Sequence, residues 1–147
     1  MQLAGQKKYH DFLFFSWCVS IIAMFGSLYF SEIRYFEPCE LCWYQRILMY
    51  PLTLILGIAV VKKDLQISFY AMMFSSIGGT LSLYHYATQK ITLLGENAIA
   101  CGRVPCTVQY INWFGFITIP FLALSAFFII FILNFAIWKY IKRGHLH

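Results

Sequence analysis

Charged residues are scarce in this chain of 147 residues. Only 12% of the residues are Asp, Glu, Lys or Arg, whereas 61% are hydrophobic and 20% are aromatic. A soluble domain of this size cannot bury so much apolar surface, so the scarcity of charge excludes an ordinary soluble protein. The net charge is +5, but the basic residues flank apolar segments instead of forming a patch among aromatic residues, so we expect no nucleic-acid binding. The composition predicts a single membrane domain covering residues 1–147.

Four segments are apolar and long enough to cross a bilayer as helices, at about 1.5 Å of rise per residue. No small-x-small cleavage site follows the first segment, so we expect it to be retained and not removed as a secretory signal. The only Asp, Glu, Lys or Arg inside any of them is Arg46. We therefore predict an all-α, four-transmembrane-helix bundle with spans at about 12–30, 42–61, 65–88 and 113–138.

The basic residues fall mainly on one side of these spans. Positive residues in short loops are retained in the cytoplasm, so their distribution predicts orientation. Both termini are expected to be cytoplasmic, with two short extracytoplasmic loops at about 31–41 and 89–112. The basic residues on the cytoplasmic side are Lys7, Lys8, Lys62, Lys63, Lys139, Lys142 and Arg143.

Four of the five cysteines gather in or beside the two extracytoplasmic loops, as the pairs Cys39/Cys42 and Cys101/Cys106. Disulfides persist on this side of a membrane, so structural disulfides, a four-thiolate metal site and redox catalysis all compete. The small ring closed by C-x-x-C suits exchange better than bracing. Zinc ribbons usually carry two C-x-x-C knuckles, and the second pair here is spaced C-x-x-x-x-C. We favour redox catalysis, expect no metal ligand and assign no role to Cys18, in the first span.

Polar side chains are predicted to share one layer of the membrane with the first cysteine pair. Cys42 falls in the first turn of the second span, where unpaired backbone N–H groups favour a thiolate. Arg46 lies one turn deeper, and His85 reaches a similar depth with Gln89 on the same helix face. Alone, the arginine is consistent with snorkelling and the histidine with core packing. Together these groups suit a flat, lipid-soluble molecule with carbonyl oxygens, such as a quinone.

The runs "EPCELCWYQRILMYP", "CGRVPC" and "NWFGFITIPFLALSAF" resemble the disulfide-bond-formation protein family, the DsbB/BdbC-type thiol:quinone oxidoreductases. The likeness is greatest to the short BdbC-type members of Gram-positive bacteria and extends from the first span to the fourth. The resemblance implies a bacterial cell membrane enzyme whose active-site cysteines lie on the extracytoplasmic side.

The resemblance also implies an order of electron flow. A thioredoxin-fold thiol oxidase outside the membrane, of DsbA/BdbD type, would attack Cys101, and Cys106 would pass electrons to Cys39. Cys42, beside Arg46, would then reduce a membrane quinone. His85 and Gln89 would lie near the quinone ring, and the Gram-positive likeness favours menaquinone over ubiquinone.

Two other kinds of protein remain as alternatives. One is a metal-binding membrane protein that uses four cysteine thiolates. The other is an oxidoreductase like vitamin K epoxide reductase, although that family carries its C-x-x-C in the fourth span. The second cysteine loop is also shorter here than in the enteric members of the disulfide-bond-formation family, which leaves less room for a large swing of Cys106 toward Cys39.

Overall fold

The computed structural model describes residues 2–35, 37, 39–91 and 118–144. Within these ranges every regular element is a helix, which confirms the predicted all-α class. A π-helical turn, η1 (Tyr29–Ile33), extends the first helix, and a 3-10 turn, η2 (Leu65–Ile67), precedes the third. The long helices are α1 (Gln2–Leu28), α2 (Glu40–Lys62), α3 (Ser68–Lys90) and α5 (Ile119–Gly144).

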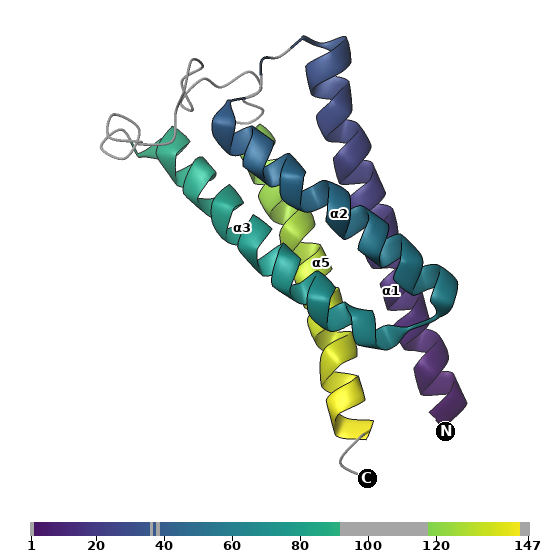
Figure 1. Ribbon diagram of the computed structural model, residues 1–147. Coiled ribbons are helices and arrows are strands. Elements are labelled where there is room, and N and C mark those ends of the chain that lie inside the picture. Colours follow the sequence, from purple (N-terminus) through teal and green to yellow (C-terminus); the bar gives the residue numbers. More distant parts are fainter. Residues whose placement is uncertain (1, 36, 38, 92–117, 145–147) are drawn as a thin grey trace.

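The four long helices form an antiparallel bundle in which α1 and α3 each pack against both α2 and α5 (Figure 1). The rings of Tyr9 and Tyr140 stack with their centroids 4.1 Å apart, which joins the start of α1 to the end of α5. Both of these helix ends therefore lie at the same end of the bundle as the turn between α2 and α3. Cys39, at the start of α2, lies at the opposite end.

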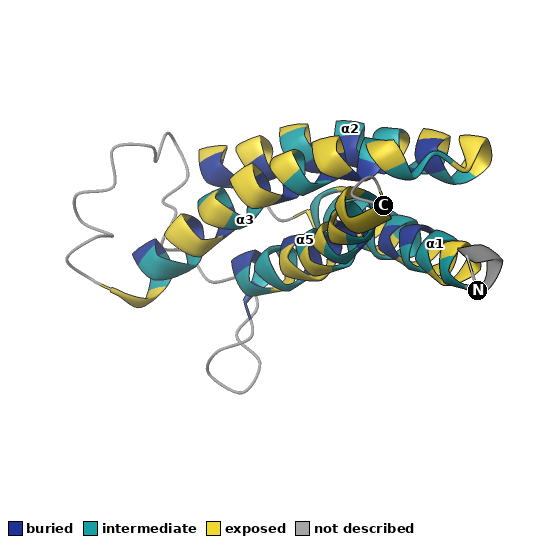
Figure 2. Ribbon diagram, turned by 90° about the horizontal axis from the view of Figure 1, so that it is seen from below, coloured by how far each residue is buried: buried dark blue, intermediate teal, exposed yellow. Residues whose placement is uncertain are grey.

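Three of the described helices are long and apolar enough to cross a membrane, over Gly5–Ile33, Glu40–Lys62 and Ile119–Gly144. The third helix, α3, is as long as α2, at 23 residues, but it is less apolar. Many of its large apolar side chains point outward, such as Ile77 (52% exposed) and Leu83 (56% exposed), whereas Phe74 packs against the core. Figure 2 shows buried positions facing the interior and exposed positions facing outward. The buried face of α3 consists of Ser68, Ala71, Ser75, Gly78, Ser82, His85 and Thr88.

A buried hydrogen bond fixes α5 against α1. The side-chain amide of Asn134 donates to the hydroxyl of Ser16 at 2.8 Å and to the backbone carbonyl of Ile130 at 2.8 Å. Asn134 and Ser16 are both fully buried. Interhelical hydrogen bonds of this kind help to associate helices in lipid, where the hydrophobic effect cannot do so.

Glycine allows α3 and α5 to approach closely beside the ring of Phe127. A Cβ atom added at Gly78 would overlap this ring, whereas a Cβ added at Gly79 would lie 3.8 Å from the Cβ of Phe127, an ordinary contact distance. Phe127 is fully buried and belongs to the main apolar core. The two neighbouring glycines therefore differ in how much space surrounds them.

We expect Gly78→Ala to destabilise the protein by about 1–3 kcal/mol, because overpacking forces α3 and α5 apart. Gly79→Ala is the matched control and should leave the midpoint of thermal unfolding nearly unchanged. The measurement is thermal unfolding of the two purified variants in the same detergent. Equal midpoints for the two variants would contradict the close approach at Gly78.

Candidate functional site

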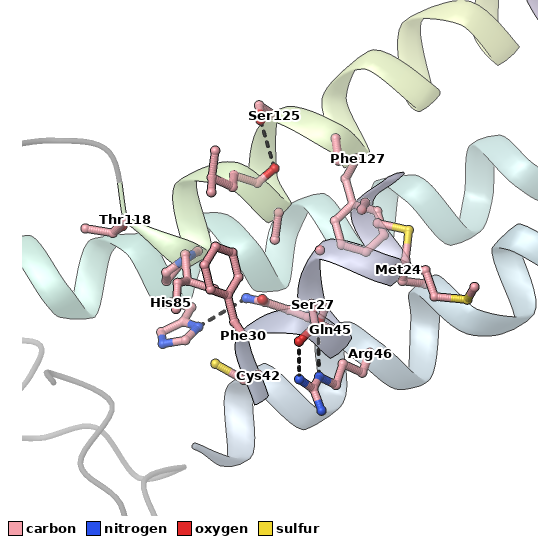
Figure 3. Close-up of a pocket in the computed structure, with 18 of the residues that line it drawn as sticks. Met24, Ser27, Phe30, Cys42, Gln45, Arg46, His85, Thr118, Ser125 and Phe127 are labelled. Atoms are coloured by element: carbon pink, nitrogen blue, oxygen red, sulfur yellow. Dashed lines mark hydrogen bonds between the residues drawn. The ribbon is translucent and has the colours of Figure 1, made fainter. Parts of the chain in front are cut away.

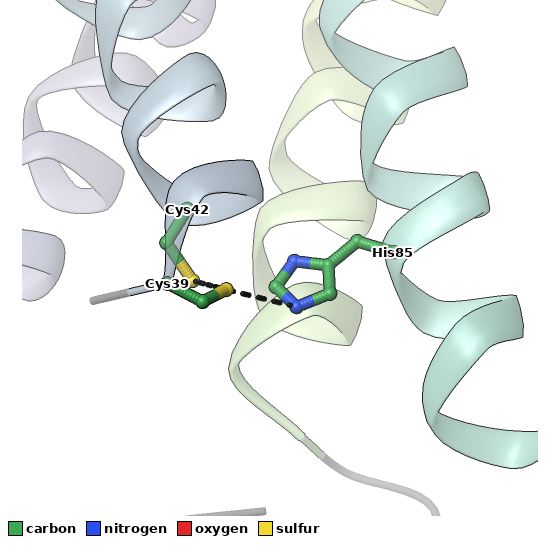
Figure 4. A group of neighbouring side chains, drawn as sticks. All are labelled: Cys39, Cys42 and His85. Carbon is green, nitrogen blue, oxygen red and sulfur yellow. Dashed lines mark hydrogen bonds between the residues drawn. The ribbon is translucent and has the colours of Figure 1, made fainter. Parts of the chain in front are cut away.

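Two cysteines lie at the start of α2. Cys39 is the N-cap residue, with extended backbone angles (φ −68°, ψ 167°), and its carbonyl accepts the first helical hydrogen bond from Trp43 N at 3.2 Å. Cys42 lies in the first turn of the helix. The two Sγ atoms are 3.4 Å apart and both thiols are free (Figure 4). The structure therefore shows the pair in its dithiol form.

His85 faces this pair from α3, the helix next to α2. Its Nε2 lies 3.5 Å from Cys39 Sγ, and the side chain is only 1% exposed (Figure 4). The contact joins residues that are 46 positions apart in the sequence. A buried imidazole at this distance can hydrogen-bond to a thiolate or exchange a proton with a thiol.

The amide of Gln45 holds the other side of the imidazole. Its Nε2 lies 3.2 Å from His85 Nδ1, and Gln45 is buried. When this N–H donates to Nδ1, the proton of a neutral imidazole must lie on Nε2. The resulting Nε2–H then points toward Cys39 Sγ. Gln45 therefore sets the histidine tautomer that the sulfur meets.

Cys39 lies at the N-cap, just before the apolar helix α2. The hydrogen bond with Cys42 is the main cause that lowers the pKa of Cys39 well below its usual value; burial opposes this shift, and the hydrogen bond with His85 reinforces it. The thiolate expected at Cys42 stays a prediction, and the structure adds a contact between Cys39 Sγ and the imidazole of His85.

Arg46 is held by α1. Its Nε donates to Ser27 Oγ at 2.8 Å, and one terminal nitrogen donates to the backbone carbonyl of Ser27 at 2.7 Å. The guanidinium also lies over the Trp43 ring, 5.6 Å from its centroid. Arg46 is only 9% exposed. Its hydrogen bonds are therefore made within the bundle, in contrast to the outward extension that the snorkelling alternative requires.

A cavity of about 400 Å³ opens beside these side chains. Cys39, Cys42, Arg46, His85 and Gln89 all line it, as do residues of α1 and α5. Figure 3 shows Cys42 and Gln45 of α2 close to His85 of α3, with Phe127 of α5 and Met24 of α1 farther along the wall. The cavity therefore combines a polar end, which holds the sulfur pair, with apolar walls.

The structure thus brings five of the predicted site residues to one cavity. The other two, Cys101 and Cys106, lie outside the described residues. Sequence reasoning missed Gln45, although its position three residues after Cys42 places the two side chains on one helix face. It also missed Ser27, whose contact with Arg46 depends on how α1 and α2 face each other.

A free dithiol at the start of an apolar helix, beside a buried histidine and a cavity with apolar walls, defines a multi-pass helical membrane protein with a thiol site. Comparison with known proteins makes this more specific. Residues 10–138 match the family described as "Disulfide bond formation protein DsbB". The chain belongs to this family.

Several relatives resemble the chain over nearly their whole length. The "Probable disulfide formation protein C" of Halalkalibacterium halodurans is 60% identical over 89% of this chain and 96% of the relative. The "Probable disulfide formation protein C 1" of Bacillus cereus is 60% identical over 93% of this chain and 99% of the relative. The "Disulfide bond formation protein C" of Bacillus subtilis is 59% identical over 82% of this chain and 88% of the relative. No solved structure gives a significant match.

We predict that neutral His85 carries its proton on Nε2 and that Gln45→Leu removes this bias, because leucine cannot donate to Nδ1. Nitrogen-15 NMR of histidine-labelled protein distinguishes the two tautomers, and the His85 signals are assigned by their loss in His85→Asn. Gln66→Leu, at an exposed position in the turn before α3, is the control and should leave the tautomer unchanged. A native His85 protonated on Nδ1 would show that the Gln45 amide has the opposite orientation.

Proposed function

We propose that the chain is a membrane thiol:quinone oxidoreductase that supports disulfide bond formation in secreted proteins. The observation that carries the proposal is the position of the Cys39/Cys42 dithiol, at the polar end of a cavity with apolar walls and in contact with His85. Membership of the DsbB family supports the same activity. It also favours this function over a metal carrier that uses four thiolates.

In the proposed topology all four long helices cross the membrane. α3 joins the three helices that are apolar enough to do so by composition. The outward apolar side chains of α3 suit contact with lipid, and its polar face is covered by α2 and α5. Lys62 and Lys63 end α2, and Lys142 and Arg143 lie in the last turn of α5, at the same end of the bundle. This end is cytoplasmic in our proposal, and the Cys39 end faces the extracytoplasmic side.

Electrons enter from a reduced, thioredoxin-fold thiol oxidase outside the membrane. Its two thiols reduce the Cys101–Cys106 disulfide and become a disulfide themselves. The Cys101/Cys106 dithiol then reduces the Cys39–Cys42 disulfide through a mixed disulfide of Cys106 with Cys39. Each exchange transfers two electrons and two protons, so the thiol oxidase is regenerated while the Cys39/Cys42 pair becomes the dithiol seen in the structure.

The cavity fits a quinone as the final acceptor. Its volume of about 400 Å³ lies in the range of small-molecule sites, which combine apolar walls with a few polar groups. When bound, a quinone accepts two electrons and two protons as the Cys39/Cys42 dithiol returns to the disulfide. We propose menaquinone rather than ubiquinone, on the likeness to relatives from Bacillus species.

Three side chains assist this step. The His85 Nε2–H stabilises the Cys39 thiolate and provides a proton-exchange group at the sulfur. The two hydrogen bonds of Arg46 to Ser27 use two of the five N–H groups of its guanidinium, so N–H donors remain for a carbonyl oxygen in the cavity. Gln89, one turn beyond His85, lines the same cavity and can hydrogen-bond to the ligand.

Replacing either cysteine tests the proposal. We expect Cys39→Ala and Cys42→Ala each to abolish quinone reduction by a reduced thioredoxin-fold partner, because neither variant can form the internal disulfide. The reaction is followed by quinone absorbance with purified protein in detergent. Cys18→Ala, which changes a half-buried cysteine of α1 outside the cavity, is the control and should keep its activity. Activity in either active-pair variant would defeat the proposal.

We expect Arg46→Lys to lower kcat/KM for the quinone about tenfold or more. Lysine keeps the charge but loses the planar fork that can hold Ser27 and a carbonyl oxygen at once. Ser27→Ala is the matched control, because it removes one hydrogen bond of Arg46 and keeps the guanidinium, so the loss should be smaller. Unchanged kinetics in Arg46→Lys would exclude Arg46 from the quinone site.

A further inference from the structure

Three atoms that bind soft metal ions converge at the reduced site. Cys39 Sγ, Cys42 Sγ and a ring nitrogen of His85 all lie within 4.8 Å of one another. The two sulfurs are 3.4 Å apart, and Cys39 Sγ is 3.5 Å from His85 Nε2. Cys39 and His85 are buried and Cys42 is half-buried. The ligands come from two different helices, and the bundle holds them in place before any ion arrives.

The Cys39–Cys42 and Cys39–His85 distances are close to those of a tetrahedral zinc site. With Zn–S bonds of about 2.3 Å and Zn–N bonds of about 2.0–2.1 Å, two sulfur ligands lie about 3.8 Å apart, and a sulfur and a nitrogen ligand about 3.5 Å apart. The Cys39–His85 distance already agrees with this geometry. The two sulfurs need to separate by only a few tenths of an ångström. The third pair, Cys42 Sγ and the His85 nitrogen, lies within 4.8 Å, and side-chain rotation has to bring it to about 3.5 Å as the ion binds.

We propose that the dithiol form binds one Zn²⁺ ion through Cys39 Sγ, Cys42 Sγ and His85 Nε2, with the fourth position open to the cavity. Binding releases the thiol protons and changes no oxidation state. Two thiolates and one Zn²⁺ form a neutral group, which lowers the cost of burying the charges in an apolar layer. Three protein ligands with an open fourth position are the usual arrangement of an exchangeable zinc site.

Gln45 is also suited to support His85 when its Nε2 binds zinc. A zinc-bound Nε2 has no proton, so the imidazole proton moves to Nδ1, 3.2 Å from the Gln45 amide. Rotation of the amide by half a turn presents its oxygen to Nδ1–H. Metal-bound histidines usually donate their other N–H to such a partner. Gln45 can therefore serve the free site as a donor and the zinc site as an acceptor.

The site discriminates between redox states, because the Cys39–Cys42 disulfide has no thiolate to offer. On the proposed function, zinc would hold the pair in its reduced form and prevent both disulfide formation and quinone reduction. The site is therefore an inhibitory one. Glu37 is exposed and lines the same cavity, where its carboxylate attracts cations toward the open side.

Cadmium binding tests the site directly, because Cd²⁺ is a close analogue of Zn²⁺ with an ultraviolet cadmium–thiolate charge-transfer band. The full chain is used with Cys101→Ala and Cys106→Ala, so that the loop thiols cannot contribute. We expect one equivalent to bind to the reduced protein, to be displaced by Zn²⁺ and to be absent after oxidation to the Cys39–Cys42 disulfide. Equal binding by the oxidised protein, or none by the reduced protein, would overturn the proposal.

Variants in the same background identify the third ligand. We expect His85→Ala to weaken Cd²⁺ binding more than 100-fold and Gln45→Leu to weaken it about 10- to 100-fold, since Gln45 supports the histidine from outside the metal shell. Gln45→Glu should restore tight binding, because a carboxylate accepts from Nδ1–H even more strongly. Cys18→Ala is the control and should bind as the parent does. Unchanged affinity in His85→Ala would overturn the proposal.

A separate assay distinguishes this inference from the proposed function. Quinone reduction by the full chain is measured with a chelator and then with added Zn²⁺. Quinone reduction that proceeds with the chelator and is inhibited by added Zn²⁺ supports both the proposed activity and the zinc site. No quinone reduction under any condition would refute the proposed function, yet the cadmium stoichiometry would still decide the metal site. Activity that persists at zinc concentrations saturating the reduced pair would overturn the inhibitory role.

Discussion

Buried polar side chains in this bundle must find their hydrogen bonds within the protein, because the surrounding hydrocarbon offers none. This requirement ties the helices together in pairs. Each tie uses a side chain from one helix and a partner on the next, so helix rotation and helix position are fixed at the same time. Such ties in the described residues include Arg46 with Ser27, Gln45 with His85, Asn134 with Ser16 and Thr53 with the carbonyl of Ser20.

The same requirement connects structure with chemistry at the sulfur pair. Gln45 satisfies one ring nitrogen of His85, and the other ring nitrogen meets Cys39. A partner that only filled space would leave the imidazole free to adopt either tautomer. An amide can donate or accept, so it can follow the imidazole through either protonation pattern. The site is therefore both preorganised and able to change state.

The sequence predicted which segments are helical and how deep each residue lies along its helix. Apolar length indicated the helices, and counting turns from the membrane edge placed the cysteine pair and His85 at one level, as their contact shows. Helix rotation about its own axis was not predictable in this way. It decides that Arg46 meets Ser27 and that Gln45 meets His85. Both contacts need the facing helix, about which a single segment of sequence carries little information.

Helix ends were also less predictable than helix centres. The last apolar segment was predicted to end at Trp138, but α5 continues to Gly144. Backbone hydrogen bonding continues into the basic region because Lys142 and Arg143 favour the negative end of a helix. The apolar pattern predicts the extent of the membrane span, whereas the helix itself continues beyond it to Gly144.

The polar inner face of α3 has a consequence for how the protein is made. In the proposed four-span topology, α3 alone has a weak tendency to partition into the bilayer, since it carries Ser, His and Thr side chains along one face and is less apolar than α2. Only a short turn of Lys63 and Asp64 and the 3-10 turn η2 separate it from α2. The two helices therefore favour insertion as a hairpin, in which α2 supplies the apolar driving force. Biogenesis and the active site then depend on the same pairing, because α2 carries the sulfurs and α3 carries the histidine.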